Sequence, residues 1–446
     1  MFKNSIVKRI LFVIILICGI LPVHAQSDSL QLSLKKVFDI ALEKNRDIKL
    51  STEQLLKADL NVSDKTNSKL PNVGFSASAG YLTNVGVLGL GNMADGFYDM
   101  PHFANSYALQ ASLLIYAGDR INTDINISKL ERDLAALSVQ RNEQNIKLIL
   151  AGYYLDLYQL YQQKTVFEKN IVLSNELLKK INDRYTEGIA LKSDKIRNEL
   201  LLSTFELSLT KLLDQIRITN NNLTTTLDLA ENTIIVPDRV VEIPLELQDL
   251  LMGQKIEELK AEALKANPDS RESETKVDIA AKRLKMVRSL NYPELSVFFS
   301  GTMNRPYTFD IPAKDIYANN NTLGVRVNIP IGNFYLTKKK IEMAAKDIDI
   351  AKQSQEIVER NLSRDVKNNF IRCKQAFDQM QTLYKQQELA DENYRRISDN
   401  YVEQLALNTE VMDATNQKLE ADLRMSQAKV QILYSYYQLL KTLGEL

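Results

Sequence analysis

The feature that most restricts the fold of this 446-residue chain is the near absence of helix-breaking residues from two long stretches. Between residues 333 and 443 there is neither glycine nor proline, and between 119 and 187 the only such residue is Gly152. Because glycine and proline most strongly disfavour helix interiors, both stretches are predicted to consist mainly of long helices. A helix of about 65 residues would be roughly 100 Å long, which is too long for the core of a globular enzyme.

Within both stretches, apolar residues recur at steps of three and four, which places them on one side of a helix. In the first stretch they include Leu130, Leu134, Leu137, Ile146, Leu150, Tyr153, Leu157 and Leu160. In the second they include Val358, Leu362, Val366, Phe370, Cys373, Phe377, Met380 and Tyr384. Such a seam is typical of helices that pack as coiled coils. We therefore interpret Cys373 as a buried packing residue rather than a reactive thiol.

The amino-acid composition argues against several kinds of binding and catalytic site. The 56 basic and 56 acidic residues balance, so a surface for nucleic acid or another polyanion is not expected. The chain has two cysteines and two histidines, and one of each, Cys18 and His24, lies before residue 26. The remaining Cys373 and His102 leave almost no basis for a metal cluster, a disulfide framework or a Cys–His catalytic pair. We therefore predict no catalytic residues, no metal site and no cofactor.

The first 25 residues have the three parts of an export signal. Lys3, Lys8 and Arg9 form a basic start, residues 10–21 are apolar, and Val23-His24-Ala25 fits a small-x-small cleavage site. A membrane-spanning helix needs about 20 apolar residues, so this shorter run favours a signal peptide at 1–25 over an anchor. Because no later segment has that many consecutive apolar residues, entry into a membrane would require a β-barrel.

Four further segments, at about 73–83, 106–116, 295–303 and 322–331, alternate apolar with small or polar residues. This period is typical either of a half-buried soluble sheet or of a membrane barrel with lipid outside and water inside. Four strands cannot close a barrel, since the smallest bacterial single-chain membrane barrels have about eight, so several chains would have to share one. In that arrangement the lipid-facing residues would be Phe75, Tyr81, Leu109, Leu113, Val325 and Ile329.

The two halves of the sequence resemble each other. Residues Ala41-Leu42 and Asn45 recur as Ala263-Leu264 and Asn267, and the segment 185–194 recurs as 401–410. We therefore predict two structural repeats, at 26–232 and 254–446, joined by an irregular connector at 233–253. Each repeat would contain a helix, two strands, a long helix, a turn and a final helix.

Several motifs then occur in a fixed order along the chain. Residues 32–45 form an opening helix motif, and Tyr116-Ala117-Gly118-Asp119-Arg120 and Ile329-Pro330-Ile331-Gly332 form two strand-to-helix corners. The segments 185–194 and 401–413 each read as a turn between long helices. Together these motifs resemble those of the TolC-type outer-membrane efflux protein family, over essentially the whole chain after the signal.

The resemblance implies a mixed membrane protein that is mostly α-helical. It would be a TolC-like homotrimer with a shared 12-stranded β-barrel, four strands per chain, in the outer membrane and a long α-helical barrel through the periplasm. Its function would be that of a passive duct, not an enzyme, in a tripartite efflux or type I secretion system. The implied partners are outer-membrane lipid, a periplasmic adaptor (membrane fusion) protein and an inner-membrane pump of the RND or ABC type. The cargo is left open.

The resemblance also implies a gate at the periplasmic tip. It places Asp194 opposite Tyr401, in a hydrogen bond that would hold the mouth of the duct shut. Glu410 and Asp413 would surround the constriction with carboxylates, which repel anions and concentrate cations. The alternative for Asp194 is a helix-capping role, which aspartate often fills.

Two residues of the second tip turn depart from the family pattern. Gln404 replaces the usual glycine, whereas Gly188 keeps it in the first turn. Ala406 stands where some relatives place an arginine of the gate network. These departures indicate that the gate is held more weakly here, or by different residues.

Two other classes of function are open at this point. A periplasmic coiled-coil adaptor or structural protein would explain the long helices, but not the four alternating strands. A secreted enzyme could use Glu410 and Asp413 as general acid and base, since residues at i and i+3 share a helix face. Two such acids are more often a solvated surface, and no nucleophile motif accompanies them. Membrane partitioning and heat-modifiable trimer migration would distinguish a duct from an adaptor.

Overall fold

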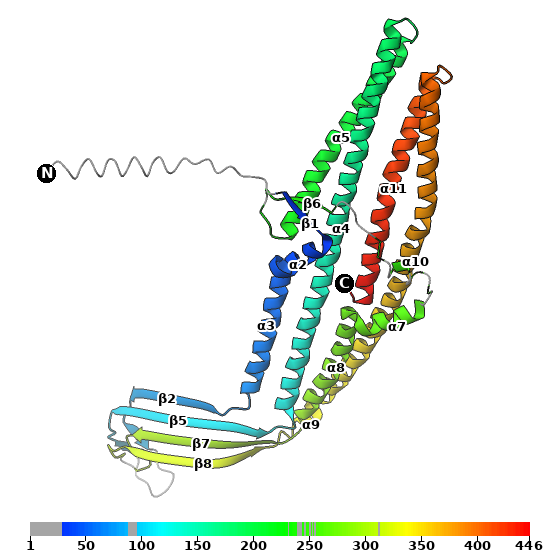
Figure 1. Cartoon of the computed structure of the whole chain (residues 1–446). Coiled ribbons are helices and arrows are strands. Elements are labelled where there is room, and N and C mark those ends of the chain that lie inside the picture. The colour runs from blue at the N-terminus through cyan, green and yellow to red at the C-terminus, as the bar shows by residue number, and fades with distance from the viewer. Residues whose placement is uncertain are drawn as a thin grey trace, which may run out of the picture.

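The computed structural model describes residues 29–87, 96–230, 232–238, 243–244, 247–248, 251, 253, 256–310 and 313–446. The predicted signal peptide at 1–25 lies outside the described residues, as does much of the connector at 233–253. Figure 1 shows a four-stranded sheet at one end of the molecule and two long helical hairpins at the other. Shorter helices run between them.

The two hairpins are built from four long helices. The first joins α4 (Arg120–Thr186) to α5 (Lys192–Thr226), and the second joins α10 (Lys338–Val402) to α11 (Asn408–Leu443). Helices α4 and α10 have 67 and 65 residues, which confirms the two very long helices predicted from the absence of helix breakers. Gly152 lies inside α4 where the Tyr434 ring of α11 approaches, 3.4 Å from where a Cβ would be. That distance is an ordinary van der Waals contact, so α4 and α11 pack side by side here in a way that an alanine would also allow.

Two pairs of shorter helices connect the hairpins to the sheet. They are α2 (Leu34–Lys44) with α3 (Arg46–Asn67), and α7 (Ile256–Ala266) with α8 (Pro268–Ser289). Asn45 and Asn267 occupy the two junctions, and each side-chain oxygen caps the helix that follows. The Asn45 amide also donates to the Thr226 carbonyl at 2.7 Å, and the Asn267 amide donates to the Thr442 carbonyl at 3.0 Å. Each junction is thereby bonded to the base of a hairpin.

The main sheet is antiparallel, with strand order β2-β5-β7-β8. These strands are β2 (Asn72–Tyr81), β5 (Phe103–Tyr116), β7 (Glu294–Arg305) and β8 (Ala318–Asn328). Strand β8 ends at Asn328 rather than continuing to 331, because Pro330 has no N–H for a ladder and α9 (Asn333–Leu336) follows. Strands β2 and β8 form the two edges, and neither edge has a further strand within the described part of the chain.

Two small strand pairs accompany the main sheet. Strand β1 (Ser29–Leu32) pairs in parallel with β6 (Ile234–Pro237) beside the base of the first hairpin (Figure 1). The Tyr154 hydroxyl of α4 donates to the Leu32 carbonyl at 2.9 Å and accepts from the Asp238 N–H at 3.1 Å, so it ties this pair to the hairpin. Strands β3 (Val85–Val87) and β4 (Gly96–Tyr98) form a short hairpin in the loop between β2 and β5.

Apolar packing is concentrated where the short helices meet the hairpins. One cluster joins α2, α3, α4, α5 and β6, and a second joins α7, α10 and α11. Cys373 is fully buried in the second cluster, and burial raises the pKa of its thiol. This confirms its interpretation as a packing residue. None of the helices in the described part of the chain has an apolar stretch long enough to span a bilayer.

The predicted seam of α10 is followed only over part of its length. Leu362, Val366 and Phe370 are buried, but Tyr384 is 63% exposed. Tyr384 instead borders a polar cleft between the two hairpins, just beyond Met380, the last residue of α10 that packs in the second apolar cluster. The periodicity of the sequence correctly predicted which side of α10 is buried, but the buried part ends where the cluster with α7 and α11 ends.

Candidate functional site

The tips of the two hairpins contain the four predicted gate residues. The first turn passes through Gly188, with a φ of 75°, and the second passes through Gln404, with a φ of 67°. This left-handed conformation suits glycine and is strained for a residue with a side chain, by roughly 1–2 kcal/mol. Gln404 thus adopts the same backbone geometry that glycine provides in the first turn.

A small apolar cluster joins the two tips. Ile181 of α4 packs against Tyr401 of α10 and Val411 of α11, and all three are buried. Ala406 packs at the margin of this cluster. The small side chain of Ala406 is partly buried there and brings no charge to these apolar side chains.

Arg184, near the end of α4, provides the polar contact between the tips. Its guanidinium donates to the backbone carbonyls of Tyr401 at 3.0 Å and Val402 at 2.7 Å. It also lies 4.9 Å from the centre of the Tyr401 ring. These carbonyls belong to the last turn of α10, where a positive charge is favourable, and the Tyr401 carbonyl also accepts from the Gln404 N–H at 3.2 Å. Arg184 therefore binds the end of one hairpin helix to the other hairpin.

Asp194 and Tyr401 lie near each other without a hydrogen bond between their side chains. Burial raises the pKa of the Tyr401 phenol, Arg184 opposes this effect, and the Asp194 carboxylate raises the pKa further. The carboxylate of Asp194 does not cap α5, since no side chain caps that helix. The predicted bond between Asp194 and Tyr401 stays a prediction.

Glu410 and Asp413 lie on the exposed side of α11. The Glu410 carboxylate accepts from the Leu407 N–H at 2.8 Å, so Glu410 has a capping role at the start of α11. The Asp413 carboxylate accepts from the Gln417 amide at 2.8 Å. Both carboxylates therefore face solvent at the tip, on the opposite side of α11 from buried Val411.

A buried amide pair also joins the tips and was not predicted. The Asn198 amide of α5 donates to the Asn408 side-chain oxygen of α11 at 2.8 Å. These two side chains are only 3% and 5% exposed. Asn198, Asn408 and Arg184 share one signal that sequence comparison could have used. At each of these three positions the two sequence repeats have different residues. For example, Arg184 of the first repeat aligns with Asn400 of the second.

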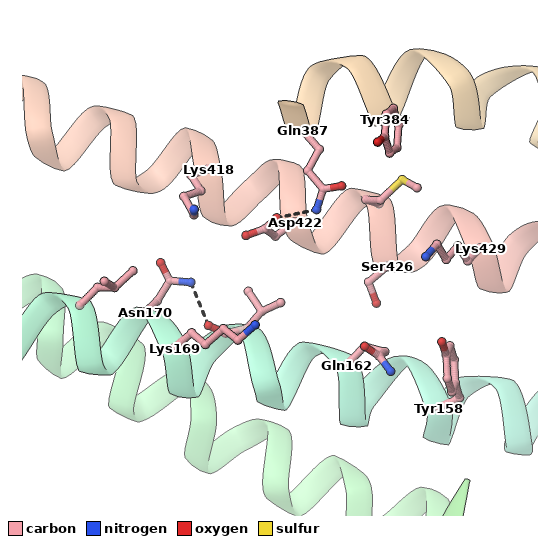
Figure 2. Close-up of a pocket in the computed structure, with 13 residues that line it drawn as sticks. Tyr158, Gln162, Lys169, Asn170, Tyr384, Gln387, Lys418, Asp422, Ser426 and Lys429 are labelled. Carbon is pink, nitrogen blue, oxygen red and sulfur yellow. Dashed lines mark hydrogen bonds between the residues drawn. The ribbon is translucent and has the colours of Figure 1, made fainter. Parts of the chain in front are cut away.

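A polar cleft of about 430 Å³ separates the hairpins between their tips and their bases. Figure 2 shows polar side chains of α4 and α11 on its opposite walls. Two buried polar atoms on these walls, Asn170 Oδ1 and Ser426 Oγ, have no hydrogen-bond partner. Other polar groups are paired on one side of the cleft, including Gln387 with Asp422 at 2.7 Å. The hairpins contact each other through apolar side chains on both sides of this cleft, in the cluster at the tips and in a cluster of α4 and α11 nearer the bases.

The register of the main sheet places most of the predicted lipid-facing residues together. Phe75 pairs with Leu109, and Leu113 is aligned through Val297 with Val325, so these side chains share one face. Tyr81 has the same parity in β2 and is 73% exposed. Ile329 lies just beyond the end of β8 and is also exposed. The opposite face carries small and polar residues such as Ser76, Gln110 and Ser112.

Comparisons with known proteins agree with this geometry. The family model described as outer membrane efflux protein matches residues 259–445. The structure is similar to the outer membrane protein VceC of Vibrio cholerae, with 13% identity, a TM-score of 0.75, and 92% of this chain and 96% of that chain covered. It is similar to the CmeC outer membrane channel of Campylobacter jejuni, with 14% identity, a TM-score of 0.73, and 92% and 85% covered. It is also similar to the open state of the MtrE outer membrane channel of Neisseria gonorrhoeae, with 17% identity, a TM-score of 0.64, and 92% and 88% covered. A comparison with curated proteins finds no match.

Proposed function

We propose that this chain is an outer-membrane efflux channel with a large periplasmic extension, and that its working form is a homotrimer; the family match over residues 259–445 and the shared fold support this. Each chain would contribute its four strands to one shared 12-stranded barrel. The observation that supports this most directly is the main sheet, which has one apolar face and two unpaired edges.

The unpaired edges argue for assembly. Lipid cannot hydrogen-bond the open N–H and C=O groups of β2 and β8, so an isolated four-stranded sheet is unfavourable in a bilayer. Because neighbouring strands in the order β2-β5-β7-β8 all run antiparallel, β8 of one chain and β2 of the next would also be antiparallel. Three chains would then close the ladder without an edge.

The two structural repeats of each chain would provide matching halves of the helical duct. We infer that 26–232 and 254–446 are structural repeats, because Asn45 and Asn267 make the same pair of bonds in both halves. Six such halves in a trimer would surround the axis with alternating hairpins. A periplasmic adaptor and an inner-membrane pump would deliver solutes to this duct, and the pump would select them.

We expect the purified, membrane-inserted protein to be a trimer that resists SDS until it is heated. The reason is that separating the chains would expose two strand edges per sheet to lipid. Electrophoresis with and without heating, together with mass measurement in detergent, tests this. A stable, membrane-inserted monomer would overturn the proposal, and a periplasmic adaptor would fractionate away from the membrane altogether.

The gate would lie at the hairpin tips, where Asp194 and Tyr401 would hold the mouth closed and Glu410 and Asp413 would surround it. Three chains would place six of these exposed carboxylates around one constriction. Their negative potential would favour cations and bind multivalent cations.

Replacing Glu410 with Gln and Asp413 with Asn together should reduce cation selectivity and weaken block by multivalent cations applied from the tip side. The carboxylates supply the negative potential, and the amides keep their size. The measurement is the reversal potential of single channels in a salt gradient. A matched control neutralises Glu356 and Glu359, an i, i+3 pair on α10 far from the tip. Unchanged selectivity in the tip variant would show that these residues do not surround the constriction.

A further inference from the structure

The polar face of the main sheet carries one cation without a carboxylate partner. The charged residues of the four strands are Glu294, Arg305 and Arg326. Glu294 forms an ion pair with Arg120 at 2.8 Å, and Arg305 forms one with Asp315 at 2.8 Å. For Arg326, no carboxylate of the described residues lies within ion-pair distance.

Arg326 is instead held by an aromatic ring. Its guanidinium lies 4.7 Å from the centre of the Phe298 ring, in a cation–π contact. Phe298 pairs across the ladder with Gly324, and a Cβ at Gly324 would lie 2.9 Å from the ring. The glycine therefore lets the ring lie against the sheet. A guanidinium stacked on a ring keeps its N–H donors at its edges, where they can bind another group.

The register shows which way this pair points. Arg326 pairs with Ser296, and Phe298 pairs with Ser112, so all four belong to the small, polar face. The other face carries Phe75, Leu109 and Val325 and is the one suited to lipid. Arg326 and Phe298 would therefore face the water-filled interior of the barrel. They lie toward the end of the sheet from which α9 and α10 start, close to the helical duct.

We propose that Arg326, supported by Phe298, forms an anion-binding ring inside the barrel. This rests on the proposed trimer, which places three guanidinium groups at one level of the channel. The ligands would be multivalent oxyanions, such as polyphosphates and polycarboxylates, because a planar guanidinium binds two oxygens of such groups at once. The duct would then have a positive ring in the barrel and a negative one at its tip.

The test uses the purified full-length protein in planar bilayers, with inositol hexakisphosphate added on the barrel side. From that side the anion reaches Arg326 without crossing the tip. Wild type should be blocked, and Arg326→Gln should need on the order of tenfold more anion for the same block. Arg326→Lys keeps the charge but not the planar fork, so it should fall between the two. Phe298→Leu should also weaken the block, since it removes the support of the guanidinium.

Arg305→Gln is the matched control, because it removes the same charge from the opposite face of the sheet. It should be blocked as wild type is, and each variant should first be shown to migrate as a heat-modifiable trimer. Equal block of wild type and Arg326→Gln would overturn the anion ring, as would an equal loss in Arg305→Gln. A wild-type channel that conducts but is not blocked overturns this inference alone. If wild type forms no channel or trimer, the proposed function fails, and this inference fails with it.

Discussion

Replacing Arg184 with methionine should produce a channel that opens much more readily than wild type. The substitution removes two hydrogen bonds to the carbonyls of Tyr401 and Val402 and the contact with the Tyr401 ring. Hydrogen bonds to a charged group contribute about 1.5–3 kcal/mol when shielded, and less at this partly exposed site. Repeated in three chains, even about 1 kcal/mol each would shift the closed state strongly. Planar-bilayer conductance and sensitivity of cells to large antibiotics measure the effect.

Two further sets of variants distinguish an effect of Arg184 from a general loss of charge and from loss of the Asp194–Tyr401 contact. Arg217→Met on α5 removes an arginine whose ion pair, within the described residues, is with Asp214 of its own helix, so it should conduct as wild type does. Tyr401→Phe combined with Asp194→Ala keeps the ring under Arg184 and removes the predicted phenol–carboxylate bond, together with the contact of the phenol oxygen with Arg184. If this double variant opens the channel and Arg184→Met does not, the gate is held by Asp194 and Tyr401. The reverse result would assign it to Arg184.

Arginine at position 113 should prevent assembly of the trimer in the membrane. Leu113 is aligned with Val297 and Val325 on the apolar face, and arginine at the bilayer midplane costs about 2–4 kcal/mol in a barrel strand. The cost would arise once in each chain. The measurement is the amount of heat-modifiable trimer in outer-membrane fractions, compared with total protein.

Gln110→Arg is the matched control for this prediction. Gln110 lies three residues earlier in the same strand, on the polar face, where it pairs with Gly74 and Ser300. An arginine there would point into water, so the trimer should form normally. Equal tolerance of arginine at 110 and 113 would mean that the two faces of the sheet have been assigned the wrong way round.

The sequence by itself determined the local structure, because local structure depends on neighbouring residues. The lack of glycine and proline predicted α4 and α10 over almost their full lengths. Alternation along each strand predicted which residues share a face, since side chains of a strand point to opposite sides in turn. The end of β8 was predicted less well, because the alternation continues to residue 331 whereas Pro330 lacks the N–H that a longer ladder would need.

Only the tertiary structure decided which residues meet at the tips. Arg184 contacts the carbonyl of Tyr401 from 217 positions away, and Asn198 contacts Asn408 from 210 positions away. No local pattern encodes such contacts, because they depend on how two hairpins lean together after each has formed. The same holds for Glu410, because its contact with the Leu407 N–H at the start of α11 was not predicted, while its place in a ring of carboxylates stays a prediction. Helices and strand faces thus follow from the chain itself, whereas the contacts that close the tips exist only once the hairpins are packed.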